Sequence, residues 1–155
     1  MTWTKLWFGE HKGKTIPHAV FSDPDWFFWA MEDGVLEDKG EELNREAQEI
    51  NQKARKIKIP QKGPEKLVAE FGVYPTTDKF AYLEIVPESR PEGGNCWDRI
   101  DRIDLEIPRV IAKYDKLGTK TLVRHVKSYL FGDSDYEMTK ERCEAFFEED
   151  DNFEL

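Results

Sequence analysis

The sequence predicts a single α+β domain with an antiparallel sheet of about four or five strands, packed by helices on one face. Two observations carry this prediction. Between residues 66 and 107, apolar and polar residues alternate as they do along a strand with one buried face. On both sides of that stretch, apolar residues recur every three or four positions, which indicates amphipathic helices. A chain of 155 residues buries enough surface to fold without disulfides or structural metals.

The first 34 residues predict a hairpin-helix module. Residues 2–16 read as a strand, a turn bracketed by two glycines at positions 9–13, and a short return strand. A helix follows, capped by Ser22 or Asp23 and stopped by Gly34. Because this helix is apolar over much of its circumference, we expect its aromatic side chains mainly in the core: Trp26, Phe27 and Trp29.

Residues 35–58 predict a long amphipathic helix. Its apolar residues repeat about every 3.5 positions, and small residues alternate with large ones. Such a stripe packs either on the protein's own core or on a second copy, and we favour packing within the domain. The alternative is a homodimer through Leu36, Leu43, Ile50 and Ile57.

The rest of the chain divides into a strand region, 66–107, and a helical, acidic C-terminal part, 108–155. The linker of residues 75–78 predicts a hairpin between the first two strands. Ile103, Leu105 and Ile107 would face inwards from the third. We predict strands at 66–74, 79–86 and 99–107, and helices at 109–114, 120–131 and 139–149.

The net charge of −9 argues at first against nucleic acid, because affinity for it comes mainly from basic side chains on phosphates. The charge is uneven, however. Ten carboxylates against two basic residues lie in positions 131–155, so the remainder is nearly neutral. Positive charge gathers in a separate basic run, which comprises Lys53, Arg55, Lys56, Lys58, Lys62 and Lys66. Such a run either stabilises a helix C-terminus or contacts phosphates.

The sequence contains none of the recognisable sets of catalytic residues. His11, His18 and His125 lack metal-ligand spacing, and the sequence predicts neither a cofactor nor a bound metal. Asp104 and Glu106 share a strand face and could hold a divalent metal, but a polar outer face explains them more simply.

The cysteine pattern and the lack of a signal peptide or a spanning segment predict a reducing, cytoplasmic location. Cys96 and Cys143 stand far apart, so we expect two buried thiols and no membrane association.

The segment from about residue 6 to residue 34 resembles a known family. Phe8-Gly9, Lys12-Gly13-Lys14 and Trp29 follow the order of the small domain at the C-terminus of exodeoxyribonuclease-X-like exonucleases. Related stand-alone bacterial and phage proteins are labelled quorum-sensing-regulated virulence factors. The resemblance implies association with DNA-processing proteins and carries no nuclease active site. The rest of the chain resembles only unassigned proteins of tailed phages.

Together these observations predict a non-catalytic accessory or binding protein of DNA metabolism, encoded by a phage. The turn would contact phosphates, because a tight turn exposes polar residues that the core does not need. A protein–protein interaction module acting on a host or phage enzyme is the alternative, and a metal-dependent nuclease around Asp104 and Glu106 is a weaker one. The predicted nucleic-acid contacts are His11, Lys12, Lys14, Lys53, Arg55, Lys56 and Lys58.

Overall fold

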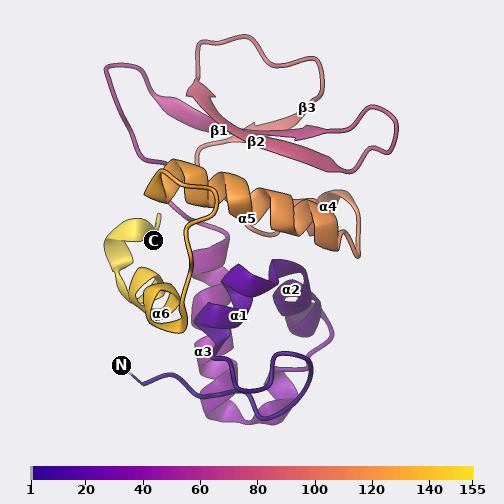
Figure 1. Ribbon diagram of the computed structural model, residues 1–155, viewed down its shortest axis with the longest axis vertical. Helices are drawn as coiled ribbons and strands as arrows, with labels where there is room; N and C mark the ends of the chain where they lie inside the picture. Colours follow the sequence, from indigo (N-terminus) through magenta and orange to yellow (C-terminus); the bar gives the residue numbers. More distant parts are fainter. Residues whose placement is uncertain (1) are drawn as a thin grey trace.

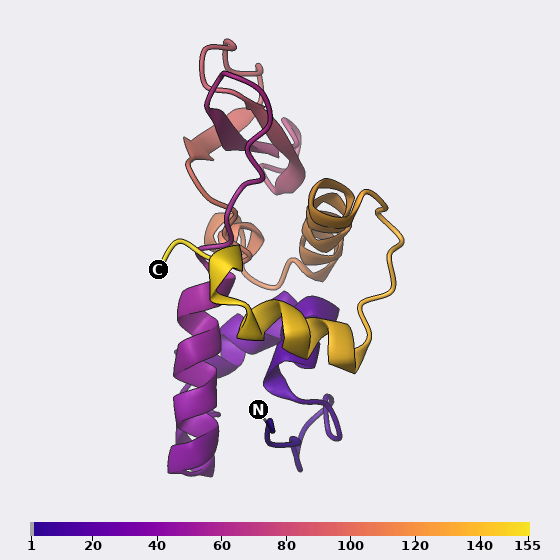
Figure 2. The same ribbon diagram turned by 90° about the vertical axis from the view of Figure 1, so that its left-hand side faces the viewer.

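The computed structural model describes residues 2–155 as a sheet stacked on two layers of helices (Figure 1). Turned by 90°, the molecule shows α5 end-on, with the sheet above it and the N-terminal helices and α6 below it (Figure 2). One cluster of buried apolar residues runs from Trp3 to Phe153 and joins the helical layers. The helices are α1 (Ile16–Ser22), α2 (Pro24–Glu32), α3 (Glu41–Ala54), α4 (Ile107–Ile111), α5 (Lys116–Phe131) and α6 (Lys140–Glu148), with 3-10 turns η1 (Glu37–Lys39) and η2 (Asp150–Asn152).

The predicted α+β class is confirmed, but within residues 2–155 the sheet has three strands rather than four or five. They are β1 (Leu67–Val73), β2 (Phe80–Pro87) and β3 (Cys96–Ile100), antiparallel in the order β2-β1-β3. Helices α4 and α5 lie below the sheet (Figure 1). The backbone N–H of Leu83 in β2 donates to His125 Nδ1 of α5 at 3.0 Å, which ties the sheet to the helix beneath it.

Three predicted strands are wrong for identifiable reasons. The N-terminal hairpin makes one isolated bridge, Lys5 with Thr15, because the chain enters α1 at Ile16, with a proline in the first turn. The predicted strand at 99–107 ends at Ile100. Beyond it, Ile103 pairs with Ile57 in an isolated bridge, and Ile107 begins α4.

The predicted helix over 35–58 is shorter, because Gly40 has a φ of 116° and separates η1 from α3. The apolar stripe itself packs inside the molecule, which confirms the favoured expectation of packing within the domain. The predicted homodimer surface is therefore wrong. A second copy cannot contact its four residues, because each is at most 2% exposed: Leu36, Leu43, Ile50 and Ile57.

The C-terminal helices are present with shifted boundaries. Helix α5 begins at Lys116, four residues before its predicted start, because the Asp115 side chain accepts the N–H of Gly118 at 2.9 Å and caps it. Helix α6 packs on α1 through rings that include Phe21 and Phe146, whose centroids are 5.4 Å apart. No helix within residues 2–155 combines the length and the apolarity that crossing a membrane requires.

Candidate binding site of the N-terminal module

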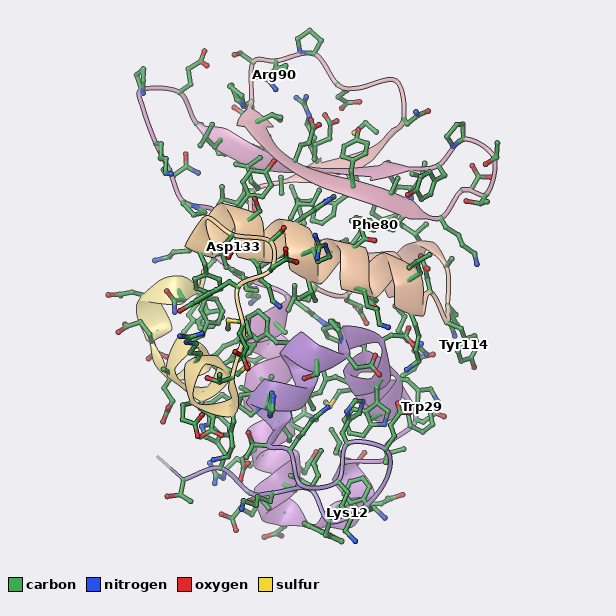
Figure 3. The ribbon with its side chains drawn as sticks, in the orientation of Figure 1. Lys12, Trp29, Phe80, Arg90, Tyr114 and Asp133 are labelled. Carbon is green, nitrogen blue, oxygen red and sulfur yellow. The ribbon has the colours of Figure 1, made fainter. Side chains whose placement is uncertain are left out.

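The glycine-bracketed turn forms as predicted. Gly9 and Gly13 have φ values of 72° and 92°, which favour glycine at both positions. The Gly13 N–H donates to the Leu6 carbonyl at 2.8 Å, and the Leu6 N–H donates to the Lys14 carbonyl at 2.8 Å. These bonds close the turn and leave the Lys12 side chain exposed at its tip (Figure 3).

The structure corrects the expected exposure of His11, whose side chain is buried. Its Nε2 lies 3.1 Å from an Asp23 carboxylate oxygen, and its Nδ1 lies 3.1 Å from Lys14 Nζ. Because an ammonium group only donates, Nδ1 accepts from Lys14 and Nε2–H donates to Asp23. The ring also packs edge-on against Trp26, with centroids 4.9 Å apart. His11 therefore positions Lys14 instead of presenting itself to a ligand.

Asp23 connects the turn to two helices. Its side chain caps α2 by accepting the Trp26 N–H at 3.1 Å, and it also binds Lys116 Nζ of α5 at 2.8 Å. Burial by itself would raise the pKa of the Asp23 carboxyl, but hydrogen bonds from Lys116, Trp26 and His11 outweigh burial and lower that pKa. Asp23 stays ionised and holds the start of α5 against the turn.

Beside the turn lies a cavity of about 500 Å³, which we name the aromatic groove. Trp29 and Tyr114 come from distant segments and lie along the same edge of the molecule as Lys12 (Figure 3). Tyr114 is 72% exposed and has a φ of 64°, which is rare for a residue with a side chain. The lining comprises Phe8, Gly9, Glu10, Asp25, Trp26, Trp29, Val35, Tyr114 and Lys116.

A second cavity, of about 250 Å³, adjoins the aromatic groove, and we name it the lysine pocket. The two cavities share Glu10 and Lys116 in their walls. Lys116 Nζ lies 3.5 Å from Glu10 Oε1 and 2.8 Å from the Asp23 carboxylate, so its single positive charge offsets part of the negative charge of these two groups. The lining comprises Glu10, His11, Lys14, Ser22, Asp23, Lys116 and Lys120.

The predicted basic run does not extend this site. Lys53 is buried, with Nζ 2.7 Å from the Phe147 carbonyl and 3.0 Å from Asp150, and Arg55 pairs with Glu106 at 3.2 Å. Lys56 and Lys58 are exposed, but they follow the C-terminus of α3.

The turn lies at the other end of α3, where Lys39 sits over the Phe8 ring. The 14 residues of α3 separate the two basic clusters by about 20 Å at 1.5 Å per residue. The predicted contacts at 11–14 and at 53–58 therefore do not form one surface.

One group within residues 2–155 has metal-ligand geometry: Glu10, His11 and Asp23 offer ligand atoms within 4.8 Å of one another. The ammonium of Lys116 already contacts both carboxylates, so a metal ion would have to displace it.

The Asp104–Glu106 pair has other roles. Asp104 accepts the Glu106 N–H at 2.8 Å, and burial raises the Asp104 pKa to about 6. Glu106 forms the ion pair with Arg55. Both carboxylates are thus engaged by other groups of the protein, which weakens the nuclease alternative.

The sequence did not single out Tyr114, Lys116 and Lys120, which lie about a hundred positions from the turn. Asp115 carried the one local signal, since an N-cap at that position would have placed both lysines in the first turns of α5. No family model matches the chain, and comparison with curated proteins and with solved structures finds no match either. The resemblance of residues 6–34 therefore stays a prediction.

Proposed function

We propose that the protein is a non-catalytic binding protein of DNA metabolism that holds a single strand of nucleic acid at the aromatic groove and the adjoining turn. The observation that carries this proposal is a groove walled by aromatic rings and Lys116, which adjoins a pocket lined by Lys14 and Lys120. Lys12 is exposed at the tip of the neighbouring turn (Figure 3). Proteins that bind single strands combine basic groups on the backbone with aromatic platforms on which bases stack.

The local charge is compatible with this function although the chain carries −9 overall. Eight of the nine net negative charges lie in positions 131–155, in α6 and its flanks, and none of these residues lines the groove. Within the site, Lys116 offsets Glu10 and Asp23 through ion pairs. Lys12 and Lys120 form no ion pair with any residue in positions 2–155, so both ammonium groups are open to phosphates.

Titration of a fluorescently labelled oligonucleotide, followed by anisotropy, tests the proposal. We expect weak binding of single strands that falls about 50-fold between 50 and 200 mM salt, as four phosphate contacts imply. Lys12→Ala with Lys14→Ala should weaken binding by about tenfold while circular dichroism shows an unchanged fold. Lys79→Ala, an exposed lysine in the loop between β1 and β2, is the matched control. Absent or salt-independent binding would contradict the proposal.

A protein partner is the second candidate, and exposed apolar side chains favour it. Val110 and Leu117 are 54% and 78% exposed in the same segment as Tyr114. Apolar surface of this kind is typical of protein-binding sites. Binding of a protein at this surface would be weakened by Leu117→Asp and little affected by salt, whereas binding of a nucleic acid would show the opposite dependence.

A further inference from the structure

The two adjoining cavities differ in chemistry in the way that the two ends of a nucleotide differ. The aromatic groove is walled mainly by apolar rings, whereas the lysine pocket carries three ammonium groups, those of Lys14, Lys116 and Lys120. Glu10 and Lys116 line both cavities and their charged groups lie 3.5 Å apart, so a ligand that spans the cavities lies against this ion pair.

The aromatic groove suits an unpaired base. Trp29 of α2 and Tyr114 before α5 supply rings on which a base can stack, while Trp26 lines the wall as a largely buried ring. Glu10, a residue of the turn, places its carboxylate in the wall of the groove, and a carboxylate only accepts hydrogen bonds. Guanine offers it two neighbouring N–H groups on its Watson–Crick edge, whereas thymine offers one.

The lysine pocket suits the phosphate of the same nucleotide. Lys14 Nζ is oriented by the buried His11, at 3.1 Å from Nδ1, and Lys116 Nζ is oriented by Asp23. Two of the three ammonium groups are thus held in place before a ligand arrives, which lowers the cost of ordering them. Lys120 extends from the next turn of α5 as the third donor.

We propose that these cavities form one nucleotide site, in which the aromatic groove holds a purine base and the lysine pocket holds its phosphate. This inference rests on the proposed function and makes it more specific. It assigns to the protein a ligand the size of one nucleotide, either a free nucleotide or the phosphorylated end of a single strand.

Quenching of tryptophan fluorescence, with calorimetry as a second measurement, tests the site. The probes are dGMP, deoxyguanosine, dTMP and inorganic phosphate. We expect dGMP to bind at least tenfold more tightly than deoxyguanosine and than phosphate alone, because only dGMP fills both cavities. Lys120→Ala should weaken dGMP about tenfold and leave deoxyguanosine unchanged, while Lys79→Ala changes neither. Glu10→Gln should reduce the preference for dGMP over dTMP.

Equal binding of dGMP and deoxyguanosine, or no binding of dGMP, would overturn the nucleotide site. Binding of the labelled oligonucleotide that still depends on Lys12 and Lys14 would then leave the proposed function standing. A short oligonucleotide with and without a terminal phosphate distinguishes the two possible ligands, a free nucleotide and the phosphorylated end of a strand. Tighter binding of the phosphorylated strand than of dGMP supports the site and assigns it to a strand end, and the reverse order supports the site and assigns it to a free nucleotide.

Discussion

Tyr114 is the residue at which backbone strain and exposure coincide. Its φ of 64° lies in the left-handed region, which costs a residue with a side chain on the order of 1 kcal/mol. Its ring is largely exposed, so packing offsets little of that cost, and the main compensating contact is the Arg109 guanidinium 5.5 Å from the ring centre. A strained, exposed tyrosine beside a groove is expected where the ring serves a ligand.

Tyr114→Gly should separate stability from binding. Glycine relieves the strained φ, so the free energy of unfolding should stay within about 1 kcal/mol of the wild type. Removal of the ring should weaken single-strand binding about tenfold, since stacking on one aromatic side chain contributes about 1–3 kcal/mol. Asp78→Gly, at the other such residue within positions 2–155, should change stability similarly and leave binding intact. Unchanged binding by Tyr114→Gly would remove the ring from the site.

At the level of the elements, the pairing of β1 with β2 depends on a missing side chain. Gly72 pairs with Tyr82, and a Cβ at position 72 would lie 1.8 Å from the Tyr82 ring. The ring is not free to move away, because its hydroxyl donates to the buried Glu70 at 2.6 Å. The sheet is therefore built around the close approach of this ring to the β1 backbone.

Gly72→Ala should lower the free energy of unfolding by about 1–3 kcal/mol, the usual cost of forcing extra volume into a packed site. Chemical denaturation monitored by circular dichroism would measure the change. Gly94→Ala is the matched control, because a Cβ there has no atom within 4 Å. Equal stability of the two variants would show that the ring relocates without cost.

The sequence predicts those helices and strands whose formation depends on residues close together in the chain. The strands at 66–74 and 79–86 and the Asp23 cap of α2 could be predicted, because alternation and capping act over a few residues. Helix α1 could not, since its seven residues are too few to show a helical period. Only part of the candidate site could be predicted from the sequence. The turn carries its own glycines, whereas Lys116 and Lys120 reach it only through the packing of α5 against α2.

At the scale of the whole molecule, the walls of the aromatic groove come from the N-terminal module and from the α4–α5 segment, and one buried arginine joins them. Arg109 of α4 donates to Asp25 of α2 at 3.2 Å, and both side chains are almost fully buried. Arg109 also contacts Glu32 at the end of α2, at 3.2 Å. The geometry of the groove therefore depends on an ion pair that water does not reach.

Arg109→Leu should lower the free energy of unfolding by about 3 kcal/mol, because the buried Asp25 carboxylate then keeps only the more distant Lys116 Nζ, at 4.0 Å. The double variant Asp25→Leu/Arg109→Leu should recover most of that loss, since apolar residues often replace a buried ion pair at little cost. Glu32→Gln is the control, because Glu32 is partly exposed and water can substitute for its pairing. Denaturation curves of the four proteins complete a double-mutant cycle. Additive losses from Asp25→Leu and Arg109→Leu would show that the two side chains act independently, and would move the constraint on the groove to other contacts between α2 and α4.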